Sequence, residues 1–121
     1  MNKSFNALIV KLFEVRQQAH IEHLATRSFS QHLALEAFYS ELLELIDELV
    51  EVYQGEFGLI QIQKGLPSTA EIDFIDCLKH LVKQLKLANG KLTGAYSYYG
   101  NIIDEITALT LRTIYKLENL K

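Results

Sequence analysis

Apolar side chains recur every three or four residues in four separate stretches of this 121-residue chain. That spacing places them on one face of an α-helix, so each stretch predicts an amphipathic helix. The stretches cover residues 4–25, 28–55, 68–89 and 101–120, and the only proline lies between the second and the third. We therefore expect an all-α fold that forms a single domain over residues 1–121.

The apolar residues that share these helix faces form the predicted core. In chain order they are Phe5, Leu8, Ile9, Leu12, Phe13, Val15, Ala19, Leu24, Leu35, Phe38, Leu42, Leu45, Ile46, Leu49, Val52, Tyr53, Ile72, Phe74, Ile75, Leu78, Leu81, Val82, Leu85, Ile103, Ile106, Leu109, Leu111, Ile114, Leu117 and Leu120. With 49% hydrophobic and 22% charged residues, the chain is apolar enough to bury such a core, which excludes a disordered protein.

Residues that favour helix ends separate the four stretches. The expected N-terminal caps are Ser28 with Gln31, Ser68 with Glu71, and Asn101. The second helix is expected to stop at Gly55 and the third at Asn89-Gly90, because glycine readily takes the left-handed conformation that closes a helix.

The connections between the helices differ in length, and this favours one topology. The first two helices are joined by a short loop, whereas the connection over residues 56–67 is long enough to cross from one end of a bundle to the other. A four-helix bundle with one long crossover is the ferritin-like arrangement, and we expect that fold.

Charge and composition exclude several classes of function. Twelve Lys and Arg against fifteen Asp and Glu give a net charge of −3, without a polybasic arm to neutralise phosphates, so DNA is disfavoured as a partner. No run reaches the roughly 18 uninterrupted apolar residues of a membrane span. The only cysteine, Cys77, cannot form an internal disulfide, and the N-terminus lacks the apolar run of a signal peptide, so we expect a cytoplasmic protein.

Five residues form the constellation that could carry chemistry. They are His20 in the first predicted helix and His32, Glu36, Asp47 and Glu51 in the second. The four on the second helix fall within an arc of about 100°, on one helix face. Residues 32 and 47 are nevertheless separated by about 22 Å along the helix axis, so one subunit cannot gather all five around a metal.

A two-fold dimer would solve this difficulty. If two copies of the second helix pack antiparallel, residues whose numbers share the same sum face each other, so His32 meets the partner's Glu51 and Glu36 meets the partner's Asp47. Imidazole and carboxylate ligands with open positions suit iron, with zinc or manganese as alternatives. We expect no catalytic residue apart from these metal ligands.

At these residues the sequence resembles the mini-ferritins, the DNA-binding proteins from starved cells known as the Dps family. The spacing His20-x11-His32-x3-Glu36-x10-Asp47-x3-Glu51 matches that family's ferroxidase centre, with Glu36 in place of its first aspartate. The sequence also resembles that family around Gln18-Ala19-His20 and in residues 104–106 and 115–120. The resemblance implies a possible ferroxidase, shared between two-fold-related subunits of a hollow assembly, which oxidises Fe(II) and sequesters iron.

A second hypothesis comes from another class of protein. The chain also resembles small ferritin-like proteins of uncertain role found in some bacteriophage genomes. It would then be a non-enzymatic oligomer that binds a protein or small ligand, in a virus–host setting, with a vestigial metal site.

Other residues have an ordinary structural interpretation beside a functional one. His23 is either a surface residue, which we favour, or an accessory ligand. Cys77 and His80 are expected to be a buried thiol beside a partly exposed imidazole rather than a metal site. Tyr96, Tyr98 and Tyr99 are expected to pack the turn before the last helix or to form an oligomer contact, and the stripe Lys79, Lys83, Lys86 and Lys91 to be a solvated face.

Overall fold

The computed structural model describes residues 2–62, 73–92 and 97–120. It contains four helices, α1 (Asn2–Ala25), α2 (Phe29–Phe57), α3 (Phe74–Leu92) and α4 (Ser97–Asn119). The described residues contain no β-strand. The predicted all-α fold is therefore confirmed, and none of these helices is long and apolar enough to cross a lipid bilayer.

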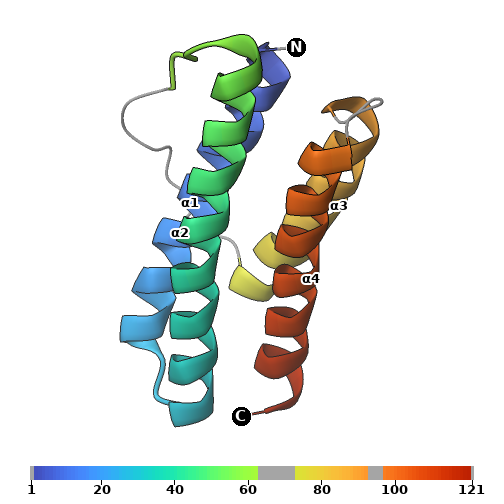
Figure 1. Ribbon diagram of the computed structural model, residues 1–121. Helices are drawn as coiled ribbons and strands as arrows, with labels where there is room; N and C mark the ends of the chain where they lie inside the picture. Colours follow the sequence, from blue (N-terminus) through green and yellow to red (C-terminus); the bar gives the residue numbers. More distant parts are fainter. Residues whose placement is uncertain (1, 63–72, 93–96, 121) are drawn as a thin grey trace.

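The four helices form a bundle in which helices that pack together run in opposite directions. In Figure 1, α1 descends from the N-terminus, α2 and α3 both rise, and α4 descends to the C-terminus. The pairs that pack together are α1 with α2, α2 with α4, α3 with α4, and α1 with α3. Each of these pairs is antiparallel, whereas α2 and α3 point the same way and, within the described residues, do not pack together. α3 therefore begins away from the end of the bundle at which α2 stops.

Each helix contributes an apolar face to one continuous core. Phe5 of α1 stacks on Tyr53 of α2, with ring centroids 3.7 Å apart, and Tyr99 of α4 lies 6.0 Å from Tyr53. Most of the predicted core residues are buried. Burial of such side chains supplies the main driving force for a bundle of this kind.

The prediction of a core position is wrong for three residues. Leu24, Leu111 and Leu120 are 72%, 48% and 46% exposed. Leu111 follows buried Leu109 by two residues, which is about 200° around the helix, so it must point away from the core. In α1 the buried stripe continues from Ala19 to His23, which leaves Leu24 outside it.

The predicted start of the second helix is confirmed. Ser28 is the N-cap of α2, and its hydroxyl accepts a hydrogen bond from the backbone N–H of Gln31 at 3.3 Å. The Gln31 side chain does not complete the capping box. Its amide oxygen accepts from the Thr26 hydroxyl, and its amide nitrogen donates to the Leu117 carbonyl of α4. Gln31 therefore ties the start of α2 to the end of α4.

The first helix ends at Ala25, as predicted, whereas several later boundaries differ from the predictions. α2 continues through Gly55 to Phe57 and ends at Gly58, whose φ is +90° and whose N–H donates to the Gln54 carbonyl. α3 continues past Asn89-Gly90 to Leu92, and α4 begins at Ser97 rather than after Asn101. The predicted cap of Ser68 with Glu71 lies outside the described residues.

Candidate metal centre

The five predicted ligands do not form one group within a chain. Glu36, Asp47 and Glu51 are exposed along the outer face of α2, whereas His20 of α1 and His32 of α2 are half-buried. The His20 ring stacks on Tyr39, with centroids 4.4 Å apart and planes at 16°. His20 is thus held by packing against α2 and takes no part in the cluster described next.

A cluster of potential ligands lies where α1 ends and α2 begins. His23, His32 and Glu36 bring one ligand atom each to within 4.8 Å of one another. His23 is only 7% exposed, so the expectation of a surface residue is wrong. The reason is that His23 occupies the position at which the buried stripe of α1 meets the first turn of α2.

Two reciprocal hydrogen bonds hold the histidines together. Nδ1 of His23 lies 2.8 Å from the carbonyl oxygen of His32, and Nδ1 of His32 lies 2.8 Å from the carbonyl oxygen of His23. A carbonyl oxygen can only accept, so each Nδ1 carries the hydrogen. In the neutral imidazole the lone pair is therefore on Nε2 of each ring, which is the atom available to a metal.

The position of His23 explains one of these bonds. The last carbonyls of a helix lack partners within that helix, and His23 lies in the last turn of α1. The Glu22 carbonyl accepts from the backbone N–H of Thr26, and the His23 carbonyl accepts from the His32 ring. His32 therefore caps the preceding helix while its own ring is oriented by that cap.

The two imidazole rings are stacked. Their centroids are 3.7 Å apart and their planes differ by 22°. Tyr39 meets the His23 ring edge-on at 5.4 Å, and the Arg16 guanidinium lies 5.6 Å from the Tyr39 ring centroid. The histidine pair thus sits beside aromatic and cationic side chains of α1 and α2.

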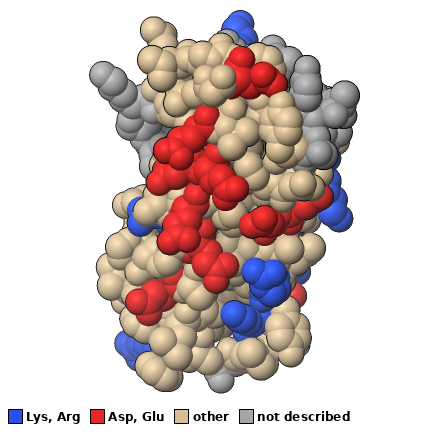
Figure 2. All heavy atoms as spheres, in the orientation of Figure 1, with Lys and Arg blue, Asp and Glu red and all other residues tan. Residues whose placement is uncertain are grey.

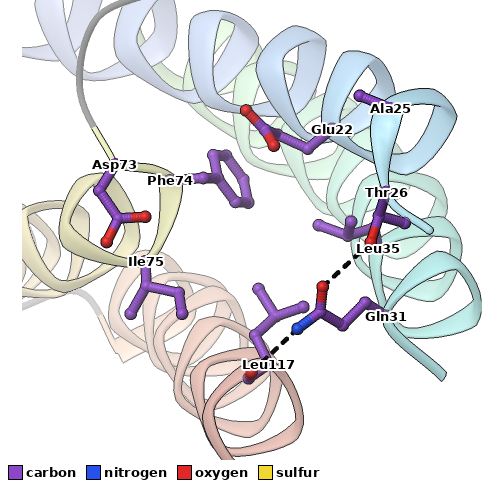
Figure 3. A pocket seen from close by; sticks show the side chains of 9 residues that line it. All are labelled: Glu22, Ala25, Thr26, Gln31, Leu35, Asp73, Phe74, Ile75 and Leu117. Carbon is purple, nitrogen blue, oxygen red and sulfur yellow. Dashed lines mark hydrogen bonds between the residues drawn. The ribbon is translucent and has the colours of Figure 1, made fainter. Parts of the chain in front are cut away.

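A separate hollow of about 300 Å³ opens at the same end of the bundle. Figure 3 shows its lining from all four helices and from Asp73, with Phe74 and Leu117 facing the polar side chains of Thr26 and Gln31. Among the described residues, the lining of this hollow offers carboxylates only from Glu22 and Asp73 and contains no imidazole. It therefore lacks the mixed ligand set of the histidine cluster.

The outer face of α2 is strongly acidic. Its seven carboxylates are all exposed, and the helix has no Lys or Arg. Figure 2 shows Asp and Glu side chains running along the middle of this face of the molecule. Arg112 of α4 lies 3.8 Å from Glu41, and the Tyr98 hydroxyl donates to Glu56 at 2.5 Å. The acidic residues thus extend along much of α2, beyond the histidine cluster.

The other residues singled out by the sequence have structural roles. Cys77 is buried and His80 is exposed, as predicted, and burial raises the pKa of the Cys77 thiol. Tyr99 is buried against the core, whereas Tyr96 lies outside the described residues. Lys79, Lys83 and Lys86 are exposed, as expected of a solvated face, and Lys91 has no described side chain.

Comparison with known proteins gives a family and one distant relative. An uncharacterized 14.6 kDa protein in the mobD-ri intergenic region of Enterobacteria phage T4 is 29% identical over 100 residues, which cover 81% of this chain and 75% of the phage protein. No solved structure matches. The model of a family of unknown function, DUF5856, matches residues 23–117, a range that includes the histidine cluster, Asp47 and Glu51 but not His20. The chain therefore belongs to this family of unknown function.

Proposed function

We propose that this protein is a ferritin-like, Dps-like bundle that binds Fe(II), oxidises it with peroxide or dioxygen and sequesters the product. One observation carries the proposal. His32 and Glu36 stand beside a second imidazole at one end of a helix face that continues into the exposed carboxylates of Asp47 and Glu51. Nitrogen and oxygen ligands in this mixture suit redox-active iron.

The bundle supports the ferritin-like part of the proposal. In the described part of the chain, every helix pair that packs together is antiparallel, and one long connection joins the parallel helices α2 and α3. Ferritin-like folds have this single long crossover and build metal sites from side chains on their helices. Fold alone does not imply chemistry, so the iron proposal depends on the side chains of α2.

In the proposed dimer, two α2 helices pack antiparallel across a two-fold axis. Glu36, Asp47 and Glu51 are exposed and so remain available to a second chain. Such packing would bring many carboxylates together, and desolvated like charges are costly unless cations neutralise them. Bound iron supplies that neutralisation, so the proposal links metal binding to dimer formation.

Iron oxidation can be measured directly. The protein is loaded with Fe(II) under anaerobic conditions, peroxide is added, and the ferric absorbance is followed. We expect a rate above that of buffer, which His32→Ala and Asp47→Asn both lower strongly. His80→Ala removes an exposed imidazole from α3 and should leave the rate unchanged. A wild-type rate equal to that of buffer would refute the ferroxidase proposal.

The non-enzymatic oligomer remains a second candidate, because apolar side chains are exposed around the α1–α2 turn. Ile21, Leu24, Phe29 and Leu33 are between 48% and 74% exposed. Exposed apolar groups near one another are typical of binding surfaces. Elemental analysis of the purified protein, combined with its mass in solution, separates the candidates: an oligomer without bound metal favours this one.

A further inference from the structure

We propose that His23, His32 and Glu36 form a site for one divalent transition-metal ion that is complete within a single chain. Among the residues that the structure describes, this is the one place where three His, Cys, Asp or Glu side chains bring ligand atoms within 4.8 Å. The inference deepens the proposed function, with which it shares His32 and Glu36. It differs in needing no partner subunit and no oxidation.

The hydrogen bonds of the two imidazoles favour metal binding. Metal-ligating histidines generally donate their other ring N–H to a carbonyl or carboxylate, which fixes both tautomer and orientation. His23 and His32 each do so, through Nδ1, to the other's backbone carbonyl at 2.8 Å. Both Nε2 atoms are thereby prepared as ligands, by bonds that involve only α1 and α2.

The third ligand is free to move into place. Glu36 follows His32 by four residues, so it lies on the same face of α2, one turn further along. It is exposed, and no side chain in the described part of the chain bonds to its carboxylate. A rotation of this side chain therefore breaks no existing interaction.

Metal binding requires a small rearrangement of the rings. At metal–ligand bonds of about 2.1 Å, tetrahedral geometry separates ligand atoms by roughly 3.4 Å, which is less than the 4.8 Å limit of the cluster. Two nearly parallel rings 3.7 Å apart also cannot both hold one ion in their planes. The rings must tilt so that their Nε2 atoms converge on the ion while their centroids move further apart, pivoting about the Nδ1–carbonyl bonds.

The ligand set indicates the class of metal. Two imidazoles and one carboxylate suit Zn(II), Co(II) and Fe(II), whereas Mg(II) and Ca(II) prefer oxygen ligands alone. Three protein ligands leave at least one coordination position for water or another small ligand. The buried side of His23 shields one flank of the ion, and exposed Glu36 leaves the other open to solvent.

The test is a Co(II) titration followed by visible absorption, at protein concentrations where sedimentation shows a single chain. We expect about one Co(II) per chain, with the absorption of a low-symmetry nitrogen-and-oxygen site. His23→Asn and Glu36→Gln should each weaken binding by at least about tenfold. Asparagine can still donate to the His32 carbonyl, and Glu36 is exposed, so both variants should keep the helical circular dichroism of the wild type.

Matched controls separate this inference from the dimer proposal. Asp47→Asn and Glu51→Gln make the same kind of change further along α2 and should leave Co(II) affinity within about twofold of wild type. As a second readout, Zn(II) should shift the Nε2 resonances of His23 and His32 in nitrogen-edited NMR spectra.

Two outcomes would overturn the inference. One is a folded wild type that binds no Co(II), and the other is binding that appears only in a dimer and is lost with Asp47→Asn. The second result would support the ferroxidase proposal instead. Binding by the single chain without iron oxidation would uphold the inference and remove the proposed function.

Discussion

Leu42 and its neighbours on α2 show how strongly position decides the effect of a single residue. Leu42 is fully buried, so Leu42→Ala should leave a cavity and lower the free energy of unfolding by about 2–5 kcal/mol. Leu33→Ala, on the same helix but at a 48% exposed position, should change it by no more than about 0.5 kcal/mol. Denaturant titrations of the two variants test this, and equal losses would contradict the core described above.

The reactivity of the Cys77 thiol measures how often the bundle opens. Burial raises the pKa of its thiol, and the carboxylate of Glu14 adds to this effect while Lys11 opposes it. Because the thiolate is the reactive form, labelling by a disulfide reagent at neutral pH should be at least ~100-fold slower in the folded protein than in denaturant. Rapid stoichiometric labelling of the native protein would contradict this.

The raised pKa of Cys77 also makes the stability of the protein depend on pH. The folded state holds the Cys77 proton more tightly than the unfolded chain does, so between the unfolded pKa and the raised folded pKa the folded state binds more protons. This contribution to stability is therefore complete below the unfolded pKa and declines as the pH rises above it. Cys77→Ser should reduce that alkaline decline, measured as unfolding free energy against pH.

At the scale of the helix, the end of α2 places two glycines in opposite situations. Gly55 lies inside the last turn, with nothing within 4 Å of an added Cβ, so Gly55→Ala should stabilise the protein by about 0.5–1 kcal/mol. Gly58 has φ +90° and ψ 174°, a conformation nearly confined to glycine, so Gly58→Ala should cost on the order of 1–3 kcal/mol. Thermal unfolding of both variants checks the signs, and a shift in the same direction would be inconsistent with this helix end.

These glycines also show how far helices can be predicted from sequence. Periodicity predicted four helices, and local capping chemistry predicted the start of α2 at Ser28. Capping chemistry could not distinguish Gly55 from Gly58, because both glycines can end a helix. α2 continues past Gly55 to Phe57, whose ring stacks on Tyr99 of α4 with ring centroids 6.3 Å apart. Helix ends are thus decided partly by tertiary contacts.

The candidate site was predictable to a similar extent. The spacing of His32 and Glu36 predicted that they lie together on α2, as they do, whereas the expectation of a surface position for His23 was wrong. The buried spacing of Leu12, Val15 and Ala19 continues to His23, and this was the signal available in the sequence. The reciprocal hydrogen bonds between His23 and His32 could not be predicted from the sequence, because they depend on how the chain turns between the two helices.

At the scale of the whole molecule, charge is divided unevenly, and this bears on assembly. All seven carboxylates of α2 are exposed on a helix without Lys or Arg, although the chain has twelve such residues. Two such faces repel each other, and salt screens that repulsion over about 10 Å at 0.1 M ionic strength. A dimer through α2 therefore needs cations between the two chains.

This requirement makes the mass in solution a decisive measurement. With a chelator at low salt we expect the mass of one chain, and Fe(II) or Zn(II) should double it. Asp47→Asn combined with Glu51→Gln should abolish the doubling, because the partner's ligands are lost. Glu44→Gln combined with Glu48→Gln removes the same charge from exposed positions of the same helix outside the predicted ligand arc, and should leave the doubling intact. If both double variants changed the mass in the same way, the metal would be screening charge rather than binding at a shared site. A dimer already present in chelator would show that no metal is needed for dimer formation.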